Sequence, residues 1–218
     1  WHVGRISDPE LLDGELPVAP SAIAPEGHVS VLRPKRPYTV PRALETHEIA
    51  GIVQDFVQAA RNAKAAGFDF IEVHAANGYL FDQFLHDGSN QRSDHSMHDS
   101  DPVALFSHVA QQIEARKLGF IFVRERLVDG VLPVGQHMRR LYSGAYIAND
   151  SMSQQDAEKL LASGAADAVA FGRAFIANPD LPTRLAQGAA LNPLVAETIY
   201  SPDATGYNDY PSLDAALE

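Results

Sequence analysis

Residues 68–80 read FDFIEVHAANGYL, and this stretch decides the fold class. The apolar run Phe68–Ala75 predicts a short buried strand. It leads directly into three hydrogen-bonding side chains, those of His74, Asn77 and Tyr79. In α/β folds, reactive groups gather on the loops that follow the carboxyl ends of strands. We therefore expect a strand end that turns over and points these three side chains into one cavity.

The three side chains suit one kind of chemistry. Neutral His74 and Asn77 can each donate a hydrogen bond, and together they can hold a single oxygen. Such a pair polarises a carbonyl group and stabilises negative charge that develops on it. Tyr79 stays protonated at neutral pH and can give up its proton in a transition state. Two donors on one oxygen, with an acid beside them, indicate the reduction of an activated double bond.

A purely structural interpretation of the same residues stands beside this one. His74 can be a satisfied core histidine, Asn77-Gly78 a turn, and Tyr79 a packing residue. A metal site is less expected, because His74 has no carboxylate or histidine partner at ligand spacing. The residues alone leave the choice between the catalytic and the structural interpretation open.

Composition limits the classes of protein to consider. The chain has 218 residues, 45% of them hydrophobic, which allows one large domain or two small ones with a substantial core. A net charge of −11 argues against a nucleic-acid or anionic-membrane partner. The absence of cysteine excludes disulfides, thiolate zinc sites and a thiol nucleophile. No apolar run approaches the ~20 residues that cross a bilayer, and no signal-peptide pattern opens the chain, so we expect a cytoplasmic protein.

Prolines and periodicity divide the chain into elements. Seven prolines within residues 5–45 predict a long loop with little regular structure. Helices are expected from a Thr46 cap to Gly67, over Leu80–Leu85, from Pro102 to about Lys117, from a Ser153 cap to Gly164, and from Asn178-Pro179 onward. Strands are expected at Phe68–Ala75, Phe120–Val123, Ala145–Ala148 and Asp167–Phe171, with a fifth to consider at Trp1–Gly4. Residues 87–101 and 191–218 are expected to be irregular.

Apolar strands that alternate with amphipathic helices predict βα units and a parallel sheet. The alternation does not separate an open doubly wound sheet from a closed barrel. No G-x-G-x-x-G follows a strand, which weakens the dinucleotide-binding open sheet. Four or five strands fall short of the eight in a (β/α)8 barrel.

A second candidate site follows the last predicted strand. Gly172 allows close approach of the backbone, and the guanidinium of Arg173 offers a fork of donors suited to phosphate. In barrels, phosphate often binds in the loops after the last two strands. The alternative is an ordinary surface arginine after a glycine that enters a helix.

Several motifs resemble the flavin-dependent ene-reductases of the old yellow enzyme family. Residues 74–85, HAANGYLFDQFL, followed by residues 90–94, NQRSD, carry the strongest resemblance. Residues 1–5, WHVGR, are similar to the third-strand motif of the bacterial members, and residues 169–181, VAFGRAFIANPDL, to the eighth-strand and phosphate segment. Residues 206–211, GYNDYP, resemble the closing motif of the family.

The resemblance implies a TIM barrel that carries FMN, uses NADPH or NADH as reductant and reduces α,β-unsaturated carbonyl compounds. It implies that His74 and Asn77 hold the substrate oxygen and that Tyr79 protonates the α-carbon. Trp1 is expected to line the substrate pocket, and Gly172 with Arg173 to bind the FMN phosphate. A small enone-type molecule is the expected partner, with a homo-oligomer as a further expectation.

Two parts of the family pattern have no counterpart in the chain. Its first two strands would precede Trp1, and only His95–Asp101 stands where a helix and the fifth strand are expected. The expected fold class is therefore an α/β, (β/α)8 barrel that is incomplete, with strands three, four, six, seven and eight recognisable. The loop Asn149-Asp150-Ser151 lacks an expected glycine pair, and Asp150 would repel phosphate unless its side chain turns away.

We expect a single barrel domain over residues 1–218. It comprises a strand end and long loop at 1–45, a βα unit with the His-Asn-Tyr site at 46–94, later βα units with the phosphate segment at 102–190, and a tail at 191–218. The start at Trp1, without Met, suggests a piece of a longer polypeptide; a truncated chain is the other explanation. The alternative functions are a non-catalytic fragment that no longer binds FMN, and a phosphate-binding lyase or isomerase that uses Arg173.

Overall fold

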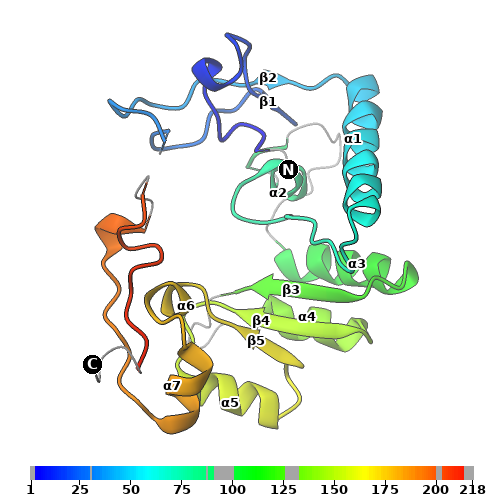
Figure 1. Ribbon diagram of the computed structural model, residues 1–218. Coiled ribbons are helices and arrows are strands. Elements are labelled where there is room, and N and C mark those ends of the chain that lie inside the picture. The colour runs from blue at the N-terminus through cyan, green and yellow to red at the C-terminus, as the bar shows by residue number, and fades with distance from the viewer. Residues whose placement is uncertain are drawn as a thin grey trace. The chain divides into compact units, whose positions relative to one another are not determined.

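The computed structural model describes residues 3–29, 31–86, 88–90, 101–125, 133–199 and 203–213 (Figure 1). The chain divides into two compact units, Trp1–Leu105 and Phe106–Glu218. Within the described ranges, no helix is both long and apolar enough to cross a membrane.

The first unit begins with the long loop predicted from the prolines. Within the described part of this loop, regular structure is limited to the 3-10 helix η1 (Pro9–Leu11) and two strands of two residues, β1 (Val18–Ala19) and β2 (Arg42–Ala43). The two strands pair in parallel, with Val18 opposite Arg42. The prolines Pro17, Pro20 and Pro41, which flank these strands, are buried.

Helix α1 (Thr46–Ala65) confirms the predicted amphipathic helix, which begins one residue earlier than predicted. Thr46 is its first helical residue, and Glu45 occupies the cap position instead. The Glu48 carboxylate accepts a hydrogen bond of 2.6 Å from the backbone N–H of Glu45. Gly67 ends the helical region with a φ of 87°, a left-handed conformation that glycine adopts without steric cost. The next predicted helix, α2 (Leu80–Leu85), has the expected bounds.

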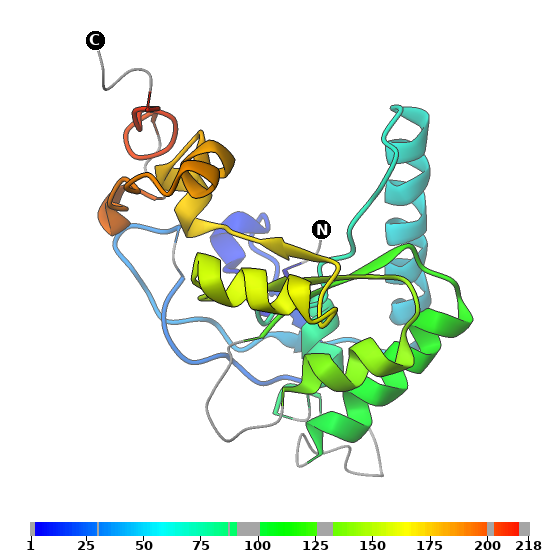
Figure 2. The same ribbon diagram turned by 90° about the horizontal axis from the view of Figure 1, so that it is seen from below.

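The prediction of a buried strand at Phe68–Ala75 is wrong. The segment between α1 and α2 is irregular, and its apolar side chains are exposed, with exposed fractions of 68% at Phe68, 77% at Phe70 and 51% at Val73. Figures 1 and 2 show it as a coil that leaves the end of α1 and leads to α2. A strand exists only within a hydrogen-bonded ladder, and within the described ranges none of the recorded ladders includes this segment. Val3 and Gly4 are not in a strand either.

The second unit contains a three-stranded parallel sheet made of β3 (Phe120–Arg124), β4 (Ala145–Asn149) and β5 (Ala168–Ala170). The strands lie in chain order, with Phe120 opposite Ala145 and Ile147 opposite Ala168. Helices α3 (Pro102–Ala115), α4 (Val134–Leu141) and α5 (Gln154–Ala162) precede or connect them. All three strands were predicted, and the α/β class with parallel strands is confirmed.

The core of this unit lies between the sheet and its helices. Its buried residues are Ala110, Ile121, Met138, Tyr142, Tyr146 and Ala166, from α3, β3, α4, β4 and the loops beside them. The side chains alternate along β3, where Ile121 is buried and Phe122 is 40% exposed. One face of the sheet is therefore covered by helices, and the other face carries Phe122.

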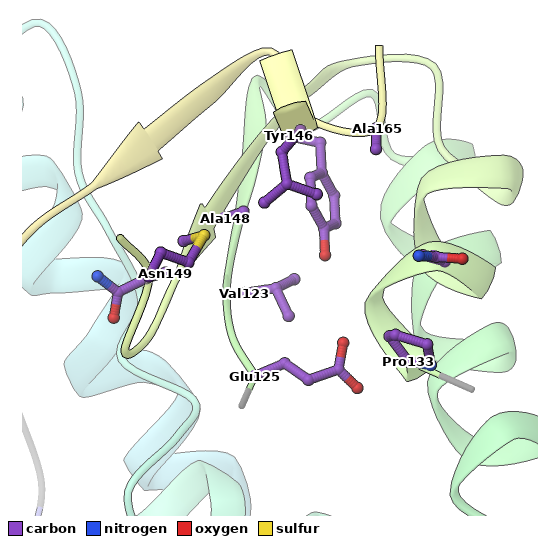
Figure 3. A pocket seen from close by; sticks show the side chains of 10 residues that line it. Val123, Glu125, Pro133, Tyr146, Ala148, Asn149 and Ala165 are labelled. Atoms are coloured by element: carbon purple, nitrogen blue, oxygen red, sulfur yellow. The ribbon is translucent and has the colours of Figure 1, made fainter. Parts of the chain in front are cut away.

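Helix α4 was not predicted, because the signal that starts it lies far away in the sequence. The Glu125 carboxylate accepts hydrogen bonds from the backbone N–H groups of Val134 (2.6 Å) and Gly135 (2.8 Å), so it satisfies donors at the helix start. Figure 3 shows Glu125 pointing toward Pro133, with the Tyr146 side chain above it in a cavity of about 30 Å³. A side chain at Gly135 would collide with the Tyr146 hydroxyl. This cavity has room only for water-sized molecules, and it belongs to the packing of the unit.

The C-terminal region differs from the prediction at one boundary. Ser153 caps α5 and bonds with Asp156 in a capping box, as predicted. The last predicted helix is instead two short ones, α6 (Arg173–Ala177) and α7 (Leu181–Gln187), and Asn178-Pro179 lies between them. The proline in the first turn of α7 is Pro182, because Asp180 takes the cap position. The described part of the tail is irregular except for the 3-10 helix η2 (Ala196–Thr198).

A buried arginine in α7 anchors this tail. Arg184 is 4% exposed, and its Nε donates to the Asp180 carboxylate at 2.7 Å. The other guanidinium nitrogens donate to the carbonyl oxygens of Ala190 (2.6 Å) and Pro211 (2.9 Å). Asp180 also accepts from the backbone N–H of Leu213 at 2.7 Å. Two distant parts of the tail therefore depend on one ion pair.

Arg184→Ala should lower the free energy of unfolding by about 3–6 kcal/mol. It removes two charge-assisted hydrogen bonds to carbonyl groups, and each such bond contributes about 1.5–3 kcal/mol. Arg116→Ala is the control, because the exposed Arg116 donates only to Gln112, one turn away, in the recorded hydrogen bonds. Urea denaturation measures both variants, and equal losses would show that Arg184 does not anchor the tail.

Tyr146 should titrate well above the ordinary range of a tyrosine. Burial, and then the negative charge of Glu125, raise the pKa of Tyr146 from its ordinary value of 10.0 to about 12. In the unfolded chain, the Tyr146 phenol loses its proton at a lower pH than in the folded chain. The stabilisation that follows from this pKa difference is therefore complete below pH 10.0 and is lost as pH rises through about 12. Ultraviolet absorbance follows the titration, and Tyr146→Phe should remove the phase near pH 12. A phase near pH 12 that survives this substitution would contradict the assignment.

Candidate functional site

A left-handed turn carries the first predicted site. Asn77 and Gly78 have φ angles of 61° and 77°, and the backbone N–H of Tyr79 donates to the Ala76 carbonyl at 3.3 Å. The chain reverses here, and the rings of His74 and Tyr79 come together with centroids 5.0 Å apart at an interplanar angle of 54°. The turn thus makes neighbours of two side chains five residues apart.

Asn77 supplies the turn conformation itself. Asparagine tolerates a positive φ better than most residues, and the Asn77 residue is exposed. The structure brings His74 and Tyr79 together, whereas the convergence of Asn77 on the same acceptor stays a prediction. Trp1, predicted to line the substrate pocket, lies outside the described residues.

The buried amide of Gln83 holds the turn in place. Gln83 lies in α2 and is 1% exposed. Its Nε2 donates to the carbonyl oxygens of Gly78 (2.6 Å) and Val3 (3.1 Å), and its Oε1 accepts from the backbone N–H of Arg5 (3.2 Å). A side chain at Gly4 would collide with this amide, and the φ of Gly4 is 60°. Gln83 therefore links the turn that carries the site to the segment that follows Trp1.

Neighbouring contacts support the same arrangement. The Asp82 carboxylate accepts from the backbone N–H of Gly78 at 2.7 Å. After α2, the Ser89 hydroxyl donates to the Gln83 carbonyl (2.9 Å), and the Asn90 amide donates to the Phe84 carbonyl (2.9 Å). The segment that follows α2 is thereby held against the helix. Of the predicted motif at 90–94, Asn90 is the residue that the structure describes.

Tyr38, in the long loop, is a neighbour of Tyr79 that sequence reasoning missed. Burial, and then the charge that Tyr79 carries when ionised, raise the pKa of Tyr38 above 10.0. Nothing in the proline-rich sequence around Tyr38 indicates that it lies near Tyr79, because the loop has no periodicity from which to place a side chain.

The second predicted site lies at the carboxyl ends of β3, β4 and β5. A pocket of about 690 Å³ is lined there by residues of all three strand ends, including Arg124, Asn149, Asp150, Ser151, Gly172 and Arg173. A side chain added at Gly172 would meet no atom within 4 Å, so open space adjoins the backbone at this position. Two guanidinium groups beside an accessible backbone are the chemistry that binds phosphate, and the residues present fit the FMN phosphate.

Asp150 is balanced by an arginine that sequence reasoning did not single out. The Nε atom of Arg124 lies 3.6 Å from the Asp150 carboxylate, and the Ser151 hydroxyl donates to that carboxylate at 2.6 Å. Asp150 and Ser151 have φ angles of 116° and 49°, so this loop adopts glycine-like conformations without glycine. The signal in the sequence was an arginine directly after the predicted strand Phe120–Val123, and in the structure Arg124 is the last residue of β3.

Comparison with known proteins places the chain in a family. The family model described as NADH:flavin oxidoreductase / NADH oxidase matches residues 1–104 and 125–192. Putative 12-oxophytodienoate reductase 4 of Oryza sativa subsp. japonica is 36% identical over 269 residues, covering 98% of this chain and 68% of the relative. A probable flavin mononucleotide-dependent alkene reductase of Leishmania infantum is 37% identical, covering 95% and 70%.

A solved structure agrees with these relatives. The old yellow enzyme homologue from Zymomonas mobilis superposes with a TM-score of 0.89 at 33% identity, over 97% of this chain and 72% of that one. The site and these likenesses define a flavin-dependent oxidoreductase. The chain belongs to the NADH:flavin oxidoreductase / NADH oxidase family, the old yellow enzyme family, and spans about two thirds of the length of these relatives. The predicted family, its ene-reductase type of enzyme, and FMN with NAD(P)H as cofactors are confirmed.

Gln83→Met should lower the free energy of unfolding by about 3 kcal/mol, because three hydrogen bonds of about 1 kcal/mol each are lost at a buried site. Gln58→Met is the matched control, since Gln58 is exposed on α1 and bonds to Asn62. It should change stability by no more than about 0.5 kcal/mol. Urea denaturation reports both values, and a Gln83 variant as stable as the control would contradict the anchoring role.

Proposed function

We propose that this chain uses the His74–Tyr79 turn to reduce the carbon–carbon double bond of small α,β-unsaturated carbonyl compounds. The observation that carries the proposal is the contact between the two rings, 5.0 Å apart, on a turn held by a buried amide. A hydrogen-bond donor and a proton donor then stand side by side. Membership of the old yellow enzyme family supports the same chemistry.

Each residue has a distinct role in this proposal. FMN, reduced by NADPH or NADH, supplies the hydride that the β-carbon receives. The His74 imidazole donates a hydrogen bond to the substrate oxygen, and the Asn77 amide donates a second one. The Tyr79 phenol gives its proton to the α-carbon as that carbon gains electron density. Trp1 lines the substrate pocket.

The phosphate of FMN is proposed to bind at the strand ends of the second unit. Arg173 supplies positive charge, and Gly172 leaves room for the phosphate to approach the backbone. The accessible space beside Gly172 and the two arginines of the pocket support this role.

We also propose that the chain folds as part of a (β/α)8 barrel, as a single domain over residues 1–218. Strands β3, β4 and β5, in chain order and parallel, are the repeating unit of a barrel and would be its strands six to eight. The rice relative aligns over 269 positions although the chain has 218 residues, which supports the expectation that an internal part of the barrel is shorter here. A cytoplasmic location and a homo-oligomer belong to the same proposal.

Tyr79→Phe should slow reoxidation of the reduced protein by an enone about 100-fold, which is typical for the loss of a general acid. Reduction by NAD(P)H should change little, because no proton from Tyr79 is needed in that half-reaction. Stopped-flow absorbance of the flavin separates the two rates.

Tyr207→Phe is the matched control, since Tyr207 is 69% exposed and lies in the other unit. Neither half-reaction should change in that variant. An equal loss in both half-reactions of Tyr79→Phe would mean that Tyr79 supports the fold of the turn and does not act as an acid.

A further inference from the structure

The parallel register brings three strand ends to one edge of the sheet. Arg124 lies opposite Asn149, and Asn149 lies opposite Ala170. The Asn149 amide donates to the Ala170 carbonyl at 2.7 Å, which fixes the ends of β4 and β5 to each other. The Arg124 side chain therefore reaches the same pocket as Arg173, although the two residues are far apart in the sequence.

The charges that line this pocket do not favour phosphate strongly unless Arg124 takes part. Among the described lining residues, the charged side chains are those of Arg124, Asp150 and Arg173. A phosphate monoester carries a charge of about −1.5 to −2 at neutral pH. Arg173 alone would be cancelled by Asp150, whereas the two arginines together leave one net positive charge.

The ion pair between Arg124 and Asp150 is open to exchange. The Arg124 side chain is 53% exposed, and the closest approach of the pair is 3.6 Å, longer than a direct charge-assisted hydrogen bond. An exposed pair of this kind contributes little by itself because water screens it. A phosphate oxygen with a larger charge can therefore take the guanidinium of Arg124 as its partner.

We propose that Arg124 is a second phosphate-binding residue of this chain and that Asp150 is the counter-charge that limits its strength. The inference rests on the proposed binding of FMN at this pocket and adds a residue pair to it. Arg124 and Arg173 approach the phosphate from the ends of different strands. Asp150 neutralises Arg124 when no anion is bound and weakens the attraction when one is.

The test uses the full chain after its flavin has been removed. Fluorescence titration measures the affinity of each variant for FMN and for riboflavin, which lacks the phosphate. Arg124→Gln should weaken FMN binding about tenfold or more, through the loss of a hydrogen bond to a charged group. Asp150→Asn should strengthen it, because the pocket gains one net positive charge. The double variant restores the original net charge, so its affinity should return toward that of the unaltered chain. Riboflavin binding should be the same throughout.

Arg116→Gln is the control, as an arginine in the turn after α3 that is not among the residues described as lining the pocket. An unchanged FMN affinity in Arg124→Gln, or an equal loss for riboflavin, overturns the role of Arg124. Weaker FMN binding in Asp150→Asn overturns the role of Asp150 as counter-charge. It would indicate that the ion pair between Arg124 and Asp150 only holds two loops together. If the unaltered chain binds FMN no better than riboflavin, the phosphate pocket of the proposed function fails and this inference fails with it.

Discussion

A buried side-chain amide must find partners for its donors and its acceptor, and this requirement organises the first unit. Gln83 meets it by bonding to Val3, Arg5 and Gly78, two parts of the chain separated by about 75 residues. Tyr79 and His74 owe their contact to a turn whose carbonyl is one of these partners, so the proposed chemistry depends on a residue that never touches substrate.

In the second unit, a ladder of backbone hydrogen bonds positions the residues of the candidate site. Parallel pairing of β3, β4 and β5 fixes the register of their ends, and the side chains just beyond them necessarily share one edge. Arg124, Asp150 and Arg173 come from three separate βα units and meet only because of this register. The negative charge of Asp150 would be unfavourable for a phosphate site by itself. Together with Arg124 and Arg173, it leaves one net positive charge in the pocket.

Local signals were enough to predict much of the fold. The Ser153–Asp156 capping box and the helical stop at Gly67 act within a few residues, so the sequence places them correctly. Helix α4 could not be predicted, because the Glu125 carboxylate that satisfies its first N–H groups lies nine residues away. The run Phe68–Ala75 has the composition of a strand, but composition does not supply the neighbouring strand that a ladder requires.

In the candidate sites, too, some residues were predicted from the sequence and others were missed. The sequence predicted that His74, Asn77 and Tyr79 converge at the end of a strand; the strand is absent, and a left-handed turn brings the His74 and Tyr79 rings together instead. Tyr38 and Arg124, which lie near the two sites, come from elements whose placement depends on tertiary contacts. Sequence patterns identify groups that do chemistry more readily than the groups that position or balance them.

The most direct test of the central claim is an anaerobic titration of the purified chain with its bound flavin. NADPH or NADH is added until the visible flavin absorbance disappears, and 2-cyclohexenone follows in small portions. We predict that the absorbance returns after one equivalent of enone per flavin, with cyclohexanone as the product. A chain that carries no flavin, or whose absorbance returns only when oxygen is admitted, would contradict the assignment as an ene-reductase.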